Sequence, residues 1–409
     1  MTIEYRQITI AERRRFSSAV EQGFGKHYTP THDAFCLDKK LLSPDMTMCA
    51  FDDGEIVGTT GAYQFESAVP GGAIIKNAGI TAVTVSATHR RRNILTNMMQ
   101  RLLKQERDKG QVIASLWASE SIIYGRFGYG VAIQHEAIKV DTTRAELKHM
   151  PAIPGRVRYV DIHEARQIFP AAWDAAVSYH VGIPKRSDDQ WDRSMIESSS
   201  QSDWGQPWFV VYEEDGEPLG YAIYYLKELG IFAGQSSGLI NADMVIYSNP
   251  ASHAALWNHL LNIDLYDQLT AWRQPVDDSL PWMLADQRQL ERKPYDGIWY
   301  RIMDVEEALN ARTYMTEGNL VIQIEDAFIP EWGGRFELDG GPDGVICGPT
   351  TKTPSITLTT ESLAAIYLGG ANTYTMQKAG RAEEHTSGSI ALFDRMLTTP
   401  KTPWCPLMF

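Results

Sequence analysis

The sequence predicts an α/β chain in which two similar modules, each a mixed central sheet flanked by helices, precede an α+β module. Strand and helix patterns alternate through residues 1–150, part of that pattern returns in residues 151–304, and a different pattern begins near residue 305. A chain of 409 residues is also longer than a single hydrophobic core normally supports. We therefore expect three domains, at residues 1–150, 151–304 and 305–409.

In the first module, short runs of apolar and β-branched residues indicate strands. These runs are residues 3–8, 46–51, 56–65, 80–85 and 111–117. Asp53-Gly54 lies between the second and third runs, which predicts a tight hairpin. Helices are expected over residues 11–24 and 94–109, the second because apolar residues recur on one face at four-residue spacing.

The middle of the chain repeats part of the first module. The segment MCAFDDGEIVGTTGAY (residues 48–63) resembles FVVYEEDGEPLGYAIY (residues 209–224), and a shift of 162 residues aligns Gly58 with Gly220. The same shift, continued along the chain, places the arginines at 90–92 on residues 252–254 and Tyr124 on Asp286. The second copy would then keep the fold without these chemical groups.

Beyond residue 305 the pattern predicts the α+β module. A helix is expected over residues 305–314, strands over 319–326 and 334–340, and a strand followed by a capped helix over 355–370.

The composition excludes several classes of function. The formal net charge of -13 disfavours nucleic acid as a partner and suits a cationic substrate. There is no run of about 18 apolar residues and no signal peptide, so we expect no membrane segment. The cysteine pattern argues against a disulfide framework, so we expect a cytoplasmic location. The 4 cysteines form no C-x-x-C pair and the 10 histidines form no H-E-x-x-H motif, so we predict no metal.

Positive charge is concentrated where a predicted strand gives way to a helix. Three arginines at 90–92 follow the strand that ends in VTV, and the helix begins near Ile94. The N–H groups of a helix N-terminus and nearby arginines together suit a pyrophosphate. Neither G-x-x-x-x-G-K-[ST] nor a G-x-G-x-x-G after a strand occurs, which argues against a nucleoside triphosphate or NAD site. The alternative is a helix terminus whose arginines are simply solvated.

The segment VTVSATHRRRNIL (residues 83–95) resembles the acyl-CoA pyrophosphate motif of the GNAT N-acetyltransferases, Gln/Arg-x-x-Gly-x-Gly/Ala. Together with ASESIIYGRFGYG (residues 118–130) it resembles the Eis (enhanced intracellular survival) family, and the resemblance extends over the whole chain, with a second GNAT-like module, a sterol-carrier-like module and a C-terminal phenylalanine. Asn93 stands where the family usually has glycine. Asparagine tolerates a left-handed backbone better than most residues, so we expect CoA binding to survive.

The resemblance implies acetyl-CoA as the co-substrate. The backbone N–H of Val83 would stabilise the oxyanion, and Val83 and Val85, with Thr84 between them, would pair with the pantetheine amides like an added strand. The residues expected around the pyrophosphate are Arg91, Arg92, Asn93, Ile94, Leu95 and Thr96. Ser119 and Glu120 would lie near the pantetheine arm.

The resemblance also implies two catalytic groups. Tyr124 would donate a proton to the leaving thiolate, since tyrosine normally titrates near pH 10 and stays protonated at neutral pH. The α-carboxylate of Phe409 would accept the proton of the amine, and burial of the apolar C-terminal segment would raise its pKa. The alternatives are that Tyr124 packs under the sheet, as we expect for Tyr129, that the C-terminal segment only stabilises the fold, and that Glu120 is the base.

For the acceptor, the resemblance implies small amines such as aminoglycoside-type polyamines, with protein lysines as an alternative. Phe24, residues 27–35 and Met408 are expected at the mouth of the pocket, and Asp33 and Glu66 are candidates for binding a polycation. The family forms hexamers, so we expect a homo-oligomer. Two other functions stay open: an idle acyl-CoA sensor, and a lipid carrier in which the GNAT modules are structural.

Overall fold

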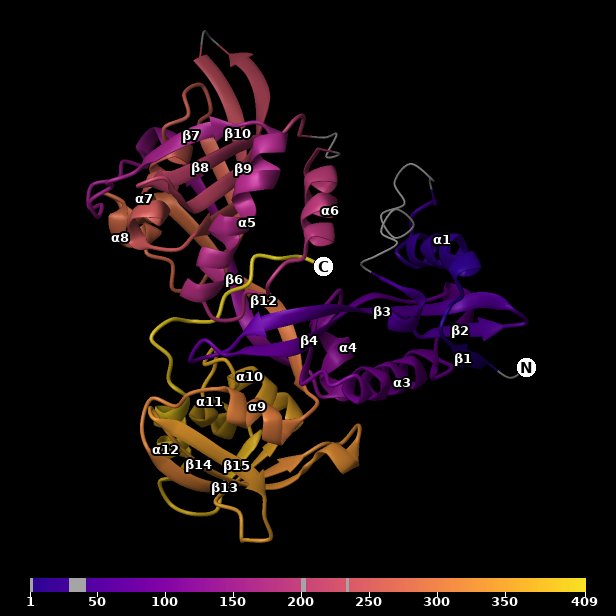
Figure 1. Cartoon of the computed structure of the whole chain (residues 1–409). Helices are drawn as coiled ribbons and strands as arrows, with labels where there is room; N and C mark the ends of the chain where they lie inside the picture. Colours follow the sequence, from indigo (N-terminus) through magenta and orange to yellow (C-terminus); the bar gives the residue numbers. More distant parts are fainter. Residues whose placement is uncertain (1–2, 29–41, 200–203, 233–234) are drawn as a thin grey trace. The chain divides into compact units, whose positions relative to one another are not determined.

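The computed structural model describes residues 3–28, 42–199, 204–232 and 235–409, and the chain divides into two compact units (Figure 1). The first unit comprises Met1–Ala132, Ile298–Pro400 and Met408–Phe409, and the second comprises Ile133–Gly297 and Lys401–Leu407. The last nine residues are thus divided between the two units. None of the helices in the described ranges is long and apolar enough to cross a membrane.

The N-terminal part of the first unit is a mixed sheet with strand order β1-β2-β3-β4-β5-β12. The strands are β1 (Glu4–Arg6), β2 (Cys49–Asp52), β3 (Glu55–Ala68), β4 (Ile74–Val85), β5 (Ile113–Trp117) and the end of β12 (Leu290–Ile302). The pairing is antiparallel except between β4 and β5, which run parallel. Helices α1 (Arg13–Gly23) and α3 (Ile94–Asp108) cover opposite faces of this sheet, and the short helix α4 (Ser121–Tyr124) follows β5 (Figure 1).

The elements predicted for the first module are confirmed. Asp53 and Gly54 have φ angles of 50° and 78°, the left-handed pair that a two-residue hairpin turn requires. Helix α3 buries five apolar side chains along one face, and Gly110 adopts φ 82° just after the helix ends. The five are Ile94, Met98, Met99, Leu102 and Leu103.

The second unit is built around a sheet with strand order β6-β11-β10-β9-β8-β7. The strands are β6 (Gly130–Asp141), β7 (Arg156–Val160), β8 (Trp208–Glu214), β9 (Glu217–Phe232), β10 (Gln235–Tyr247) and β11 (Gln268–Pro275). Its helices are α5 (Ile162–Tyr179), α6 (Asp188–Ser199), α7 (Pro250–Leu261) and α8 (Leu280–Met283). Strands β10 and β11 are parallel, as β4 and β5 are in the first unit.

The repeat is confirmed up to the end of the fourth strand of each copy. Gly58 pairs with Val85, and at the same shift Gly220 pairs with Tyr247. The continuation of the shift past this point is wrong. Helix α3 begins only at Ile94, after a loop of residues 86–93, whereas α7 begins at Pro250, almost directly after β10.

The second unit therefore has no counterpart of the arginine loop. Residues 252–254 lie inside α7 instead. The short helix after β11 ends at Met283, so Asp286 is not the structural counterpart of Tyr124. The conclusion that this copy lacks the chemical groups still stands, because the loop that would carry them is missing.

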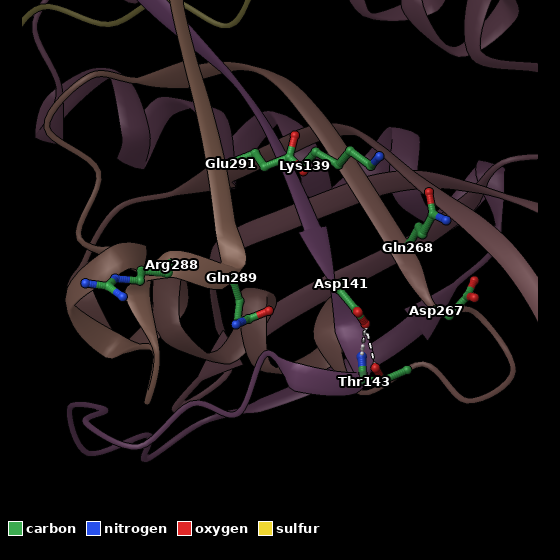
Figure 2. A pocket seen from close by; sticks show the side chains of 8 residues that line it. All are labelled: Lys139, Asp141, Thr143, Asp267, Gln268, Arg288, Gln289 and Glu291. Atoms are coloured by element: carbon green, nitrogen blue, oxygen red, sulfur yellow. Dashed lines mark hydrogen bonds between the residues drawn. The ribbon is translucent and has the colours of Figure 1, made fainter.

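One open cavity of the second unit has a volume of about 390 Å³ (Figure 2). It is lined by Lys139, Asp141, Thr143, Asp267, Gln268, Arg288, Gln289 and Glu291. Asp141 turns back to its own chain and accepts hydrogen bonds from the Thr143 N–H and hydroxyl, at 3.0 and 2.6 Å. Two basic and three acidic side chains border the cavity, so charges of both signs face it.

The C-terminal part of the first unit is the predicted α+β module. Its sheet has the order β15-β14-β13-β16-β17. The elements are α9 (Val305–Ala311), β13 (Gly318–Glu325), β14 (Gly334–Gly341), β15 (Gly344–Pro349), β16 (Ile356–Thr359), α10 (Thr360–Ile366), α11 (Thr373–Lys378), β17 (Ala382–Glu384) and α12 (Ser389–Leu397). As predicted, Thr359 caps α10, accepting a hydrogen bond from the Ser362 N–H.

A buried ion pair joins this module to the first sheet. Arg301 on β12 is fully buried and donates to Asp326 at 2.5 Å and to the carbonyl of Phe127 at 2.5 Å. Asp326 also accepts the N–H groups of Phe328 and Ile329. Removing one partner of such a pair leaves an uncompensated buried charge, so the contact is costly to break. Because Arg301 binds both the Phe127 carbonyl and Asp326, it holds the segment that follows Tyr124 against the C-terminal module.

Candidate active site

The parallel strands β4 and β5 separate in the middle of the sheet. Their ladder runs from the pair Asn77–Ile113 to the pair Gly79–Ser115 and stops there, although both strands continue. On the side of β4 that faces β5, the backbone from Ile80 to Val85 is therefore outside the ladder. A strand edge of this kind offers N–H and C=O groups to an extended ligand.

A β-bulge accompanies this separation. The register between β3 and β4 shifts between the pairs Thr59–Thr84 and Gly61–Thr81, and Ala82 takes the left-handed φ of 54°. The Thr59 hydroxyl donates to the Ala82 carbonyl at 2.7 Å and lies 2.7 Å from the Thr84 hydroxyl. The buried threonine pair thus satisfies a carbonyl that the bulge removes from regular pairing. Val83, the residue predicted to supply the oxyanion N–H, follows directly.

Two residues of the loop before α3 have a left-handed backbone conformation. Arg91 has φ 63° and Asn93 has φ 59° and ψ 17°, so Asn93 adopts the left-handed conformation that asparagine tolerates better than most residues. The Asn93 side chain does not cap the helix. The first N–H groups of α3, at Ile94, Leu95 and Thr96, have no intrahelical acceptor and are oriented for an anion.

Two contacts with Asp52 hold this loop. Asp52, at the end of β2, lies 3.1 Å from the Nε2 of His89 and 3.6 Å from the Nη1 of Arg92. His89 therefore helps to fix the turn. Arg90, Arg91 and Arg92 are otherwise exposed. Their charge stands at the positive end of a helix dipole, which an anion would offset.

Tyr124 lies at the end of α4 and is 4% exposed. It belongs to the same apolar cluster as Val83 and Leu95, so the structure brings together residues from the open strand, the helix N-terminus and the α4 turn. Burial raises the pKa of Tyr124, a side-chain hydrogen bond with Ser119 opposes that rise, and the charge of Glu120 adds to it. Ser119 and Glu120 themselves are exposed.

Tyr129 packs edge-to-face against Tyr124, with ring centroids 6.0 Å apart. It is completely buried, and its hydroxyl is without a hydrogen-bond partner in the part of the chain that the structure describes. Burial holds the pKa of Tyr129 far above its ordinary value. This environment is that of a packing side chain.

Phe409 lies at the point where β4 and β5 separate. Its ring packs edge-on against Phe65 of β3 at 4.9 Å between centroids. Both rings lie over Gly79, where an added Cβ would be 2.3 Å from Phe65 and 3.2 Å from Phe409. Gly79 is also the last β4 residue in the ladder. The C-terminal residue therefore packs at the base of the open strand edge.

Sequence reasoning missed Gly79 and Ser115. A glycine inside a strand pattern signals a close approach by another group, so "NAGITAV" carried a usable indication. Ser115, opposite Gly79, is 1% exposed, and its hydroxyl has no hydrogen-bond partner among the described residues. No sequence signal marked it, because a serine in a strand usually only fills space.

The expected pocket-mouth residues are placed in part. Asp33 and residues 29–35 lie outside the described residues. Phe24 and Met408 are 53% and 57% exposed. Glu66 is exposed on β3, next to Phe65, and so its side chain points to the face opposite to the Phe409 ring.

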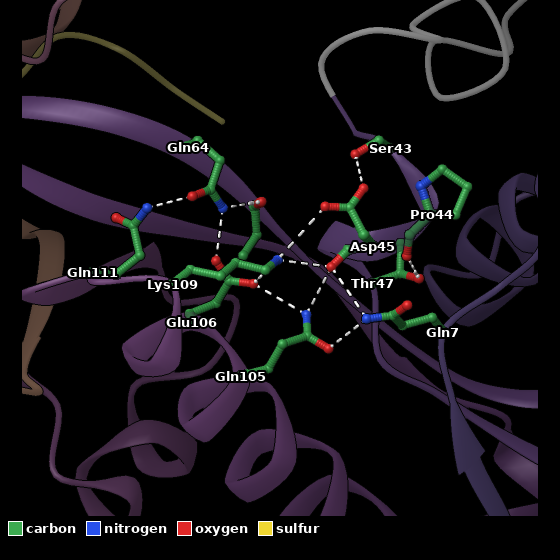
Figure 3. Close-up of polar contacts among 11 residues, drawn as sticks. Gln7, Ser43, Pro44, Asp45, Thr47, Gln64, Gln105, Glu106, Lys109 and Gln111 are labelled. Atoms are coloured by element: carbon green, nitrogen blue, oxygen red, sulfur yellow. Dashed lines mark hydrogen bonds and ion pairs between the residues drawn. The ribbon is translucent and has the colours of Figure 1, made fainter.

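The chain re-enters the described structure in a polar network beside α3 (Figure 3). The carbonyl of Asp45 accepts hydrogen bonds from Gln105 at 2.9 Å and Lys109 at 2.7 Å. Glu106 is fully buried and accepts from Lys109 and from Gln64, at 2.8 and 2.7 Å. These contacts hold Asp45 and Gln64 against α3. Within the described ranges, no three His, Cys, Asp or Glu side chains are grouped so as to hold a metal ion.

Comparison with known families agrees with this geometry. Residues 4–132 match a model described as an acetyltransferase (GNAT) domain, residues 182–302 match a second model with the same description, and residues 305–406 match a sterol carrier protein domain. Two GNAT domains and a sterol carrier domain in one chain define a GNAT-type N-acetyltransferase, which uses an acyl-CoA as co-substrate.

Full-length relatives refine this class. An uncharacterized N-acetyltransferase of Streptomyces avermitilis is 36% identical over 369 residues, covering 90% of this chain and 90% of that protein. The N-acetyltransferase Eis of Mycobacterium bovis is 32% identical over 352 residues, covering 83% and 82%. The crystal structure of Eis1 from Mycobacterium abscessus superposes with a TM-score of 0.87 at 28% identity, covering all of both chains. The chain belongs to the Eis-like GNAT N-acetyltransferases, and the predicted fold class and resemblance are confirmed.

Proposed function

We propose that the protein transfers the acetyl group of acetyl-CoA to primary amines, of the aminoglycoside type, by direct attack in a ternary complex. The observation that carries this proposal is the end of the β4–β5 ladder at Gly79 and Ser115. An open strand edge, an uncapped helix N-terminus, Tyr124 and Phe409 all adjoin it. We also propose that the three domains comprise residues 1–150, 151–304 and 305–409.

The proposed binding mode uses backbone groups first. Val83 and Val85, with Thr84 between them, form the edge to which the two amides of a pantetheine arm add as a short strand. Ser119 and Glu120 flank this arm. The diphosphate meets the free N–H groups of the α3 N-terminus, and Arg91 and Arg92 supply charge. The residues proposed for the diphosphate are Arg91, Arg92, Asn93, Ile94, Leu95 and Thr96.

The proposed chemistry follows from the same residues. The carboxylate of Phe409 accepts a proton from the acceptor ammonium, and the neutral nitrogen then bonds to the thioester carbon. The N–H of Val83 donates to the carbonyl oxygen as negative charge develops there. As the carbon–sulfur bond breaks, the Tyr124 hydroxyl gives its proton to the leaving sulfur. The nitrogen loses its second proton to solvent as the amide forms, and solvent returns a proton to Tyr124 and takes the one held by Phe409. The raised pKa of Tyr124 supports its role as donor, because the hydroxyl stays protonated at neutral pH.

The acceptor class rests on charge and on the family. The formal net charge of -13 favours the approach of polycationic amines. Protein lysine is the alternative acceptor, and a side-chain amine carried on a polypeptide would need an open approach to the Phe409 region. A homo-hexamer is the assembly that the family suggests, and light scattering would measure it.

A thiol-release assay tests the proposal. Protein tagged at the N-terminus only is mixed with acetyl-CoA and a panel of aminoglycosides, small polyamines and lysine peptides, and free CoA is measured with a thiol reagent. We expect amine-dependent release, with the acetylated product seen by mass spectrometry. If CoA binds but no amine on the panel accelerates release, the protein is an acyl-CoA sensor. Tight lipid binding without any release would support the lipid carrier instead.

A further inference from the structure

The second unit repeats the strand separation of the first. The parallel ladder of β10 and β11 runs from the pair Leu239–Gln268 to the pair Ala242–Ala271 and then stops, while β10 continues to Tyr247 and β11 to Pro275. The register of β10 against β9 shifts next to this point, between Ala242 and Met244. The second unit therefore retains the geometry that in the first unit opens a strand edge for a ligand.

In the second unit this opening is filled by Trp404. The Trp404 ring stacks on Tyr247, with centroids 5.5 Å apart and planes at 26°, and its Nε1–H donates to the carbonyl of Arg273 at 2.6 Å. Tyr247 stands on β10 and Arg273 on β11, beyond the last ladder pair. The indole thus bridges the two separated strands. Trp404 is 1% exposed.

Trp404 lies against the residue of the second unit that corresponds to Val85 of the first. Tyr247 occupies the register position that Val85 has in the first unit, since each pairs with the second glycine of its hairpin motif, Gly220 or Gly58. Val85 belongs to the edge proposed to bind pantetheine. The C-terminal segment of the chain therefore lies where an acyl-CoA arm would lie in an active copy.

Neighbouring contacts hold the same segment. The backbone N–H of Trp404 donates to the carbonyl of Val181 at 2.8 Å, and the backbone N–H of Thr402 donates to the Asp277 carboxylate at 2.9 Å. Lys401 donates to the carbonyl of Tyr179 at 2.8 Å and lies over the Tyr179 ring. Residues 403–406 are buried. Such a set of backbone and side-chain bonds orders a chain terminus that would otherwise be mobile.

We propose that the second GNAT module is a receptor for the C-terminal segment of its own chain, and that Trp404 is a positioning residue for the carboxylate of Phe409. The proposal rests on the proposed function for its kinetic part. The five residues that follow Trp404 reach at most about 18 Å, so an anchored indole sets an upper limit on the distance between Trp404 and the carboxylate. If the segment were released, the Phe409 carboxylate would sample many positions in solvent. The filled groove also leaves this module unable to bind acyl-CoA.

Hydrogen exchange tests the docking without requiring activity. In the full-length protein we expect slow exchange of the amides of Thr402 and Trp404, and fast exchange in Trp404→Ala. Trp404→Phe keeps the stacking on Tyr247 and loses the bond to Arg273, so it should be intermediate. The control is Trp282→Ala, because Trp282 is a 73% exposed tryptophan of the same unit. Exchange of residues 401–409 in the unaltered protein at the rate of an unstructured peptide would overturn the proposal.

Kinetics test the positioning role. Trp404→Ala should lower kcat on the order of 10², the usual share of a positioned general base, while the KM for acetyl-CoA stays unchanged. A chain that ends at Met408 should lose a similar amount, and adding Trp404→Ala to it should cost nothing more. If the double variant loses kcat by the product of the two separate factors, Trp404 acts through general stability, and its role in positioning the carboxylate is refuted.

Binding stoichiometry provides a third, independent result. Calorimetric titration with CoA should give one site per chain. Two sites in the unaltered protein would mean that the second module still binds the nucleotide, and would overturn the receptor assignment. If the full-length protein shows slow exchange and one CoA site but no turnover with any amine, the docking holds and it is the proposed function that fails.

Discussion

Replacing Tyr124 by phenylalanine removes one hydroxyl from the α4 turn and leaves the ring in place. A thiol titrates near pH 8.5, so below that pH the leaving sulfur needs a proton, and Tyr124, whose pKa burial raises, is protonated throughout this range. We expect kcat to fall by about 10² to 10⁴, or about 2.7 to 5.5 kcal/mol of transition-state stabilisation. The lost hydrogen bond with Ser119 should cost only about 1 kcal/mol of folding free energy.

The assay is thiol release as a function of pH, with the dissociation constant of CoA measured in parallel. Above about pH 8.5 the thiolate leaves without help, so the defect of Tyr124→Phe should shrink there. Tyr129→Phe is the matched control, because the Tyr129 hydroxyl is buried and unpartnered among the described residues, and its removal should leave kcat unchanged. An equal rate loss in both variants, or a Tyr124→Phe defect that is constant from pH 7 to 10, would refute the proton-donor role.

Four further outcomes are expected. Asp326→Ala should lower the free energy of unfolding by about 3 to 5 kcal/mol, since Arg301 is left charged and buried; a urea titration that shows less than about 1 kcal/mol would contradict this. Ser115→Ala should leave the free energy of unfolding unchanged or raise it by about 1 kcal/mol, because the hydroxyl is buried without a partner among the described residues; a clear loss of stability would reveal a hydrogen bond. Arg91→Ala should raise the KM for acetyl-CoA about tenfold at low salt and less at high salt, and a salt-independent KM would show that the arginine makes no phosphate contact. A C-terminal amide on Phe409 should reduce kcat about 10² or more while an N-terminal tag has no effect, and an unchanged rate would eliminate the carboxylate as the base.

Local chemistry made much of the fold predictable. The Asp53-Gly54 turn, the buried face of α3 and the Thr359 cap follow from rules that act within a few residues. The shared register of the two copies was also readable, because glycine turns and β-branched runs recur at one spacing. The sequence also contains a signal for the short connection in the second copy. Asn249-Pro250 is typical of a helix start, with asparagine as the cap and proline in the first turn.

The candidate site was less predictable because its parts are far apart in sequence. The contact of Phe409 with Phe65 and the approach of both to Gly79 depend on the packing of the folded chain. The anchoring of His89 and Arg92 by Asp52 is likewise a tertiary contact. Patterns along the chain predict which residues form strands and helices, but not which distant side chains meet.

Gly79 has no side chain, and the rings of Phe65 and Phe409 occupy the space that this leaves beside β4. Even the methyl carbon of an alanine at this position would lie 2.3 Å from Phe65 and 3.2 Å from Phe409, so both rings would have to move. A single added carbon in the middle of a strand would therefore displace the two aromatic side chains at the base of the strand opening.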